Sequence, residues 1–308
     1  MDILTLKSTA KGMATFFPGV AKLGARGTGG TNSARYCYSV WLRHLVFAHH
    51  NGLDRVPERL GEIGPGESVG VGLAALLSGA CHYSAIDAKS YINSELNLKI
   101  FDELLELFRN RENIPNDDEF PRVWPLLDSY KFPEEILPEP FIEECLSSSR
   151  VSSIRSAIKQ LPEENPWLAY TAPWTDASVV RPETLDLILS QAVLEHVDDL
   201  DTIYRLMAQW VRPGGMISHV IDYSSHGHAA HWDGHWALGA IHWNLIRGKR
   251  LWLINRVPHS HHIHLINRNG FRITQELRRI DKSYLEDMEK VKVGVKFHPE
   301  DLKTRGAL

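Results

Sequence analysis

Cysteine is scarce in this 308-residue sequence and forms no recognisable pattern. The three cysteines, Cys37, Cys81 and Cys145, are scattered and odd in number, and none belongs to a C-x-x-C pair. Neither a disulfide framework nor a thiolate zinc site is therefore expected. This usage is typical of a reducing compartment, and the cytoplasm is the default expectation.

Long apolar runs and a surplus of charge of one sign are also missing. The longest uncharged apolar run, residues 69–86, is interrupted by glycines, His82 and Tyr83, so we expect it in a folded core and not across a membrane. The N-terminus carries Asp2 early and lacks the apolar stretch of a secretory signal. A net charge of −4 gives no overall field that would attract nucleic acid or an acidic membrane surface.

The remaining composition is that of a soluble globular protein, with 43% hydrophobic and 23% charged residues and room for one large or two modest domains. Glycines interrupt residues 1–32 so often that no helix is expected there. Prolines mark short segments between residues 115 and 166, of which 141–145 and 151–161 can be helices. We interpret about 111–166 as a mainly helical insertion, either a cap over the substrate or a dimer contact.

One stretch organises the rest of the chain: Leu60-Gly-Glu-Ile-Gly-Pro-Gly-Glu-Ser-Val-Gly70. A short apolar approach ends in an acid and continues into glycines. Residues 71–80 can form a helix closed by Gly79, and residues 81–87 can form a second strand that ends in Asp87. Strand, glycine turn, helix, strand and acid, with the acid about 20 residues beyond the turn, predict a nucleotide-binding βαβ unit.

The glycine spacing indicates which ligand the turn favours. A dinucleotide fingerprint needs G-x-G-x-x-G, but after Gly64 and Gly66 the third position is Val69. Glu62 precedes the pair, where a carboxylate would repel a pyrophosphate at the helix N-terminus. The same carboxylate suits a ligand with an ammonium group and no phosphate. A glycine turn in an unrelated α/β protein is the alternative at this point.

A second pattern follows further along the chain. Residues Leu185–Ser190 are mostly apolar, as expected for a buried parallel strand. A polar run at Gln191–Val197 follows, and after it come a predicted helix over Asp199–Trp210, the turn Arg212-Pro-Gly-Gly215 and a predicted strand over Met216–Asp222.

The E-x-G-x-G turn with Asp87, the run D-L-I-L-S-Q-A-V-L-E-H-V at 186–197 and the R-P-G-G turn resemble the class I S-adenosylmethionine-dependent methyltransferases over about residues 55–280. The resemblance implies an α/β fold, a Rossmann-like, doubly wound and mostly parallel sheet of about seven strands with helices on both faces. It also implies S-adenosyl-L-methionine as cofactor, with Asp87 on the ribose hydroxyls. The implied cofactor-binding residues are Glu62, Gly64, Pro65, Gly66, Asp87, Ala88, Asp176, Ala177, Ser190 and Gln191.

The resemblance also predicts how the chain is divided. Residues 1–54 form an N-terminal segment with a cofactor-covering helix, whose Arg35 and Tyr36 are further candidates for the cofactor site. Residues 55–280 form the methyltransferase domain, and 281–308 form a tail or last strand. The sixth strand is expected at 271–273, and the seventh is either very short or built from 291–297.

Ten of the sixteen histidines lie between His219 and His264. A hydroxyl acceptor gains from a general base, and histidine suits that role near neutral pH. His219 and His226, which flank Asp222, and His196 after the fourth strand are therefore candidate bases, and Asp222 is a candidate partner carboxylate. For any single histidine, an ordinary hydrogen-bonded or exposed role is the alternative.

Two other interpretations of the histidine-rich segment stay open. Histidines 226, 228, 231 and 235, with Asp233, offer metal ligands, but their spacing matches no tight signature, and no metal ligand is predicted. Tryptophans 232, 236, 243 and 252 either stack on the rings of a sugar or polyketide acceptor or pack the segment against the sheet.

The sequence thus predicts an S-adenosylmethionine-dependent methyltransferase that methylates a hydroxyl of a small molecule, such as a sugar or glycoside, by in-line displacement. A nicotinamide-dependent oxidoreductase is the first alternative, and Glu62 and the missing third glycine speak against it. A non-catalytic, methyltransferase-like partner subunit is the second, and the intact glycine motif speaks against that. No nucleic-acid partner is expected, and the oligomeric state is open, with a homodimer as one option.

Overall fold

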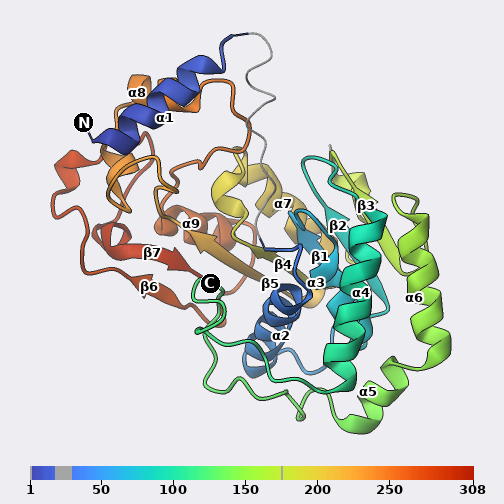
Figure 1. The fold of residues 1–308 in the computed structure, drawn as a ribbon. Coiled ribbons are helices and arrows are strands. Elements are labelled where there is room, and N and C mark those ends of the chain that lie inside the picture. Colours follow the sequence, from blue (N-terminus) through green and yellow to red (C-terminus); the bar gives the residue numbers. More distant parts are fainter. Residues whose placement is uncertain (1, 18–29, 175) are drawn as a thin grey trace. The chain divides into compact units, whose positions relative to one another are not determined.

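The computed structural model describes residues 2–17, 30–174 and 176–308, and the chain forms two compact units (Figure 1). Unit 1 consists of Met1–Arg26, Ala192–Arg205 and His219–Leu308, and unit 2 consists of Gly27–Gln191 and Leu206–Ser218. Helix α7 (Leu200–Trp210) and strand β5 (Val211–Asp222) each have residues in both units.

Unit 2 holds the parallel part of the sheet. Its strands are β1 (Arg59–Ile63), β2 (His82–Ile86), β3 (Leu168–Thr171) and β4 (Leu185–Gln191). β1 pairs with both β2 and β4, β2 pairs with β3, and all of these pairings are parallel. Parallel strands bring their carboxyl ends to one edge of a sheet, where ligands bind in open α/β folds. Glu62, opposite Ala85 and Leu189 in the register, lies near that edge.

The helices of unit 2 follow from their apolar patterns. They are α2 (Ala34–His50), α3 (Gly70–Leu77), α4 (Ser94–Arg109), α5 (Glu139–Cys145) and α6 (Ser148–Gln160). Every residue of α3 is buried, as its apolar composition requires. α4 buries one apolar stripe, and the Asn93 side chain caps it by accepting the Leu96 N–H at 3.0 Å. α6 packs beside α4 (Figure 1).

The segment between α4 and α5 falls within the predicted insertion, and it packs on α2. Arg43 of α2 is fully buried and donates hydrogen bonds to the backbone oxygens of Val123 at 2.6 Å and Pro115 at 2.9 Å. The Tyr38 hydroxyl donates to the backbone oxygen of Glu112 at 2.7 Å. These bonds satisfy carbonyls that the proline-rich chain cannot pair in a helix or sheet, and they fix the segment to the core of unit 2.

Unit 1 holds the antiparallel part of the sheet. The end of β5 pairs with β7 (Thr304–Ala307), and β7 pairs with β6 (Arg278–Ile280), both antiparallel. The seven strands follow the order β3-β2-β1-β4-β5-β7-β6. The predicted α/β fold with a mostly parallel sheet of about seven strands is confirmed.

The prediction that residues 1–32 contain no helix is wrong, because α1 spans Ile3–Ala14. Asp2 caps α1, and hydrogen bonds from Thr5 and Leu4 lower the pKa of its carboxyl to about 2. α1 lies along α8 (Ala240–Arg247) at a distance that only a glycine allows (Figure 1). A Cβ on Gly12 would stand 2.0 Å from the backbone oxygen of Leu245. Packing against α8 therefore stabilises a helix that the glycine count argued against. The glycines at 19, 24, 27 and 29 lie outside the described residues.

The predicted position of the sixth strand is also wrong. Residues 271–273 follow helix α9 (His259–Arg268) as irregular chain, after Gly270 with φ +83°, and the strand lies at 278–280 instead. The seventh strand is the very short one of the two alternatives, and residues 291–297 form no strand. Whether a segment of three or four residues forms a strand depends more on the strand with which it pairs than on its own residue pattern.

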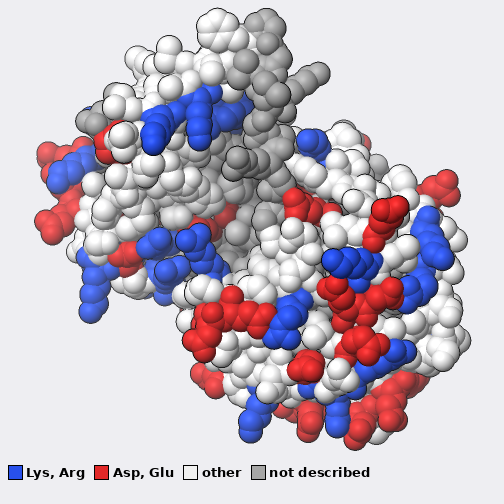
Figure 2. Space-filling view, viewed as in Figure 1, with Lys and Arg blue, Asp and Glu red and all other residues white. Residues whose placement is uncertain are grey.

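Charged side chains of both signs are interspersed on the face shown in Figure 2. On unit 2 some of them link neighbouring helices, as in the ion pair between Arg155 of α6 and Asp102 of α4. Within the described ranges, no helix has both the length and the apolar character needed to cross a membrane.

Candidate active site

The turn after β1 holds two glycines in conformations that other residues avoid. Gly64 has φ +70° and Gly66 has φ +78°, both in the left-handed region where a side chain is strained. The Gly64 N–H donates to the backbone oxygen of Ile86 at 2.8 Å and so ties the turn to β2. Pro65, between the two glycines, is buried. Val69, where a dinucleotide fingerprint would have its third glycine, is the N-cap of α3.

Glu62 lies just before this turn and is 2% exposed. The Tyr83 hydroxyl donates a hydrogen bond to its Oε2 at 2.6 Å. Burial raises the pKa of the Glu62 carboxyl to about 8; the bond from Tyr83 acts in the opposite direction, and the charge of Asp87 adds to the rise. Glu62 is therefore largely protonated near neutral pH in the ligand-free protein. An ammonium group placed beside it would favour the ionised form.

Asp87 follows β2 and presents a carboxylate at the same turn. Its Oδ1 accepts the N–H groups of Ala88 at 2.7 Å and Lys89 at 3.3 Å, and its Oδ2 lies 3.4 Å from the Gly66 nitrogen. Burial raises the pKa of Asp87, and the N–H groups of Lys89, Ala88 and Gly66 oppose that rise. Each carboxylate oxygen has two lone pairs, so Oδ2 keeps capacity for the hydroxyls of a ribose. Ala88 itself is exposed.

Two further predicted cofactor residues lie after β3. The Asp176 side chain accepts the Ser178 N–H at 2.8 Å and caps a short 3₁₀ turn that begins at Ala177. Asp176 is exposed and Ala177 is half-buried. Ser190, by contrast, is fully buried near the end of β4.

Gln191, the last residue of β4, takes part in a buried hydrogen-bonded chain that the sequence analysis missed. Its Oε1 lies 3.1 Å from Nε2 of His44 on α2, and Nδ1 of His44 lies 2.7 Å from Oγ of Ser218. Burial lowers the pKa of His44 to about 4, so this imidazole is uncharged near neutral pH. His44 fixes the orientation of the Gln191 amide. No sequence motif includes His44. It lies in a predicted helix, and its position in that helix does not distinguish it from other histidines.

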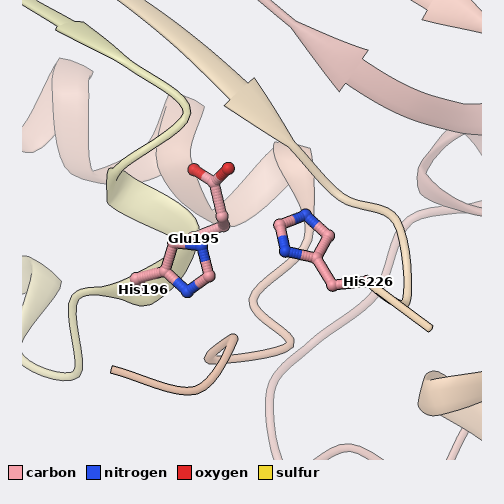
Figure 3. Close-up of side chains that lie close together, drawn as sticks. All are labelled: Glu195, His196 and His226. Atoms are coloured by element: carbon pink, nitrogen blue, oxygen red, sulfur yellow. The ribbon is translucent and has the colours of Figure 1, made fainter. Parts of the chain in front are cut away.

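A separate polar group lies in unit 1 and is formed by Glu195, His196 and His226 (Figure 3). Glu195 and His196 follow β4, and His226 follows β5 in the left-handed conformation, with φ +48°. One carboxylate oxygen or ring nitrogen from each of the three lies within 4.8 Å of the others. The two imidazole rings are 5.2 Å apart between centroids.

Glu195 is the most unusual member of this group. It is 3% exposed, and neither of its carboxylate oxygens has a hydrogen-bond donor at the usual distance and angle. Burial raises the pKa of this carboxyl well above its usual range; the backbone N–H groups of Glu195 and Asp222 act against that rise, and the charge of Asp222 adds to it. The sequence analysis passed over Glu195, although it stands in the same L-E-H phrase as His196.

Both histidines of the group are held by one ring nitrogen. His196 Nδ1 lies 2.8 Å from the backbone oxygen of Trp252, and His226 Nε2 lies 3.3 Å from Oδ2 of Asp222. Burial, reinforced by the nearby His226, lowers the pKa of His196 to about 4. Burial alone would raise the pKa of Asp222, but its hydrogen bonds with His226 and Ser224 bring it to about 2.

Asn255 clamps the loop that carries Glu195 and His196. Its side-chain amide donates to the backbone oxygens of Leu194 and Val197, each at 2.8 Å, and its own N–H donates to the backbone oxygen of Glu195 at 2.6 Å. The loop is therefore held from a second segment of unit 1, which limits how far these two side chains can move.

His219 does not join this group. Successive residues of a strand point to opposite faces, so His219 and Asp222 of β5 lie on different faces of the sheet. His219 is buried edge-on against the ring of Tyr204, with centroids 6.4 Å apart. The structure thus brings together three of the four predicted catalytic residues, namely His196, Asp222 and His226.

The other histidines of the loop take separate partners. His228 Nδ1 lies 3.1 Å from the Ser8 hydroxyl, and His231 pairs with Asp233. His235 is buried beside Trp236. Of the four tryptophans in the segment, those at 232, 236 and 243 are buried, and Trp252 is 40% exposed. These three tryptophans therefore pack the segment, which was one of the two interpretations of its aromatic residues.

Comparison with known proteins bears on the identity of this fold. Residues 151–218 match a family model described as a methyltransferase domain, and the match covers the run 186–197 and the R-P-G-G turn. Together with the glycine turn and the strand order, this match supports the resemblance that the sequence predicts. The chain resembles a class I S-adenosylmethionine-dependent methyltransferase. S-adenosyl-L-methionine is the cofactor of that class, and the paired acids at the glycine turn fit its ammonium and ribose groups.

Solved structures of methyltransferases resemble the chain at low identity. Phosphoethanolamine N-methyltransferase 2 of Haemonchus contortus has a TM-score of 0.39 at 11% identity over 80% of this chain and 43% of its own, so this chain spans less than half of that enzyme. An S-adenosylmethionine-dependent methyltransferase of Mesorhizobium loti has a TM-score of 0.37 at 15% identity over 82% and 87%. A putative methyltransferase of Haloferax volcanii, in complex with the Trm112 activator, has 0.38 at 12% over 88% and 85%. No curated protein matches the chain.

The family match begins inside the segment predicted as an insertion. Its first residue, Val151, lies in α6, the helix that precedes β3. Most of α6 thus lies in both the segment predicted as an insertion and the matched range. Arg35, a further candidate for the cofactor site, is paired with Glu119 by two contacts of 2.6 Å, and Tyr36 packs edge-on against Phe120.

Proposed function

We propose that the methyltransferase transfers the methyl group of S-adenosylmethionine to a hydroxyl oxygen of a small molecule or glycoside. The observation that carries this proposal is the pair His226 and Asp222, beside His196, in the segment that follows β5. Alcohols and phenols are weak nucleophiles until they lose a proton, and a histidine oriented by a carboxylate is suited to handling that proton.

The cofactor supplies the activated methyl group, and the chain supplies position and charge. Glu62 is proposed to bind the ammonium group of the cofactor, because near neutral pH a neighbouring cation would favour ionisation of this buried carboxyl. Asp87 is proposed to bind the ribose hydroxyls through its Oδ2. Gln191, whose amide His44 holds in place, is proposed to bind the cofactor at the end of β4.

On the acceptor side, His226 and Asp222 are proposed to handle the hydroxyl proton, with His196 as their neighbour. The exposed ring of Trp252 is proposed as a surface for a sugar or aromatic ring.

The test is methyl transfer from methyl-labelled S-adenosylmethionine to matched pairs of acceptors, such as a glycoside and the amino sugar that replaces its hydroxyl by an amine. We expect label on oxygen, and a loss of about 10²- to 10⁴-fold in kcat for His226→Ala with unchanged cofactor affinity. His264→Ala, on the exposed side of α9, is the matched control and should keep full activity. Label on nitrogen or carbon with the hydroxyl acceptors inert would refute O-methylation.

A further inference from the structure

The group of Glu195, His196 and His226 has a feature that a proton-transfer site does not need. A carboxylate that is 3% exposed and accepts no hydrogen bond of acceptable geometry is costly to bury, unless a cation or a proton compensates it. Figure 3 shows the side chains of Glu195, His196 and His226 lying close together. No Lys or Arg pairs with Glu195 among the residues that the structure describes.

The two histidines have the arrangement found in metal ligands. Trp252 accepts from Nδ1 of His196, which leaves Nε2 as the nitrogen with a lone pair. Asp222 lies at Nε2 of His226, which leaves Nδ1. Metal-bound histidines commonly donate their other N–H to a backbone carbonyl or a carboxylate, which fixes the tautomer and orients the ring. Here His196 has a backbone carbonyl as its partner, and His226 has a carboxylate.

We propose that Glu195, His196 and His226 together bind one divalent transition-metal ion, such as Zn²⁺ or Mn²⁺. Two imidazoles and a carboxylate are borderline ligands that such ions prefer, whereas Mg²⁺ and Ca²⁺ prefer sites made wholly of oxygen. Ligand atoms around a tetrahedral zinc ion lie roughly 3.4 Å apart, given metal–ligand bonds near 2.0–2.1 Å. One ligand atom from each residue lies within 4.8 Å of the others, so rotations of the side chains would bring the three donors to that spacing.

This site differs from the one that the loop sequence suggested. Of the loop histidines at 226, 228, 231 and 235, only His226 contributes, and the other two ligands come from the segment after β4. Asn255 holds that segment by its hydrogen bonds to Leu194 and Val197, so two ligands are fixed before an ion arrives. A three-ligand set leaves positions on the ion for water or for an acceptor oxygen.

The role of this ion in catalysis rests on the proposed function. A hydroxyl bound to a divalent cation loses its proton more readily, because the cation stabilises the alkoxide. With the ion bound, both ring nitrogens of each histidine are engaged, so neither histidine takes the hydroxyl proton directly. The proton would pass to solvent water, His196 and His226 would hold the ion, and Asp222 would orient His226.

The experiment uses the full chain, stripped with a chelator and dialysed, and titrates it calorimetrically with ZnCl₂ and separately with MnCl₂. We expect one equivalent to bind per chain and to raise the melting temperature, since an ion that binds only the folded state stabilises it. Glu195→Gln keeps the shape of the buried side chain, and we expect at least a tenfold weaker affinity. His226→Ala should weaken binding similarly, and the control His264→Ala should bind as the wild type does.

The inference is overturned if the stripped wild-type chain takes up no stoichiometric ion, or if Glu195→Gln and His226→Ala both bind as tightly as the wild type. Cofactor binding and the melting temperature, measured on each metal-free variant, establish whether that variant is folded. If Glu195→Gln does not fold, His226→Ala alone tests the site. If the chain binds one metal ion but methylates no hydroxyl, the metal site is supported and the proposed function is refuted. If metal-free and metal-loaded protein methylate a hydroxyl at the same rate, the proposed function is supported and the role of the ion in catalysis is refuted.

Discussion

Replacing Glu62 by glutamine should stabilise the ligand-free protein at alkaline pH. Glu62 is buried beneath the glycine turn, with the Tyr83 hydroxyl as its hydrogen-bond partner, and burial raises its pKa to about 8. Glutamine has nearly the same shape and can accept the same bond from Tyr83, but it has no charge to desolvate. The substitution therefore removes one ionisation and leaves the packing in place.

The size of the effect follows from the two pKa values. The pKa of Glu62 is about 8 in the folded chain, against an ordinary value of 4.5 that we take for the unfolded chain. Between these values the unfolded state has released the proton and the folded state still binds it, so stability falls as the pH rises through this window. The loss is about 1.4 kcal/mol per pH unit and reaches about 5 kcal/mol above pH 8, an upper bound for a residue of this kind. Below pH 4.5 the contribution vanishes.

The measurement is urea unfolding followed by circular dichroism at several pH values between 5 and 8.5. The wild type should lose stability across that range relative to Glu62→Gln, and the two should converge near pH 5. Glu143→Gln on α5 replaces an exposed carboxylate and should follow the wild-type curve. Parallel curves for the wild type and Glu62→Gln over the whole range would show that Glu62 ionises normally in the folded chain.

Substitutions at three positions test the packing that carries the site. Gly12→Ala should cost about 1–3 kcal/mol, because its Cβ meets the backbone oxygen of Leu245 on α8, and a thermal melt within error of wild type would contradict this. Arg43→Met should cost at least about 3 kcal/mol in urea unfolding, since it strips buried donors from the carbonyls of the proline-rich segment; a neutral effect would mean that water replaces them. Asp2→Ala should cost about 1 kcal/mol through loss of the α1 cap, whereas Asp2→Asn should cost less, and equal losses would refute a capping role.

The parallel half of the fold could be predicted because its signals are local. β4 is a mostly apolar run, and the acids at positions 62 and 87 stand where β1 and β2 end. The missing third glycine at Val69 was also informative, since it breaks the dinucleotide fingerprint. These features depend on neighbouring residues alone.

The rest depends on contacts between distant parts of the chain. α1 is a helix because it packs on α8, more than 200 residues away, and β6 lies where β7 pairs with it. Glu195 and His226 are 31 positions apart, and no spacing rule connects a buried acid after one strand with a histidine after the next. His219 was favoured for its place beside Asp222, but the alternation of a strand sends the two to opposite faces.

Binding of S-adenosylmethionine, measured by isothermal titration with the wild type, Asp87→Ala and the exposed control Asp128→Ala, tests the central claim most directly. The account predicts saturable binding to the wild type and the control, little affinity for NAD, and about a 10- to 100-fold weaker affinity for Asp87→Ala, because hydrogen bonds to a charged carboxylate contribute about 1.5–3 kcal/mol. Binding of NAD in place of S-adenosylmethionine, or equal affinity of Asp87→Ala and the wild type, would contradict it.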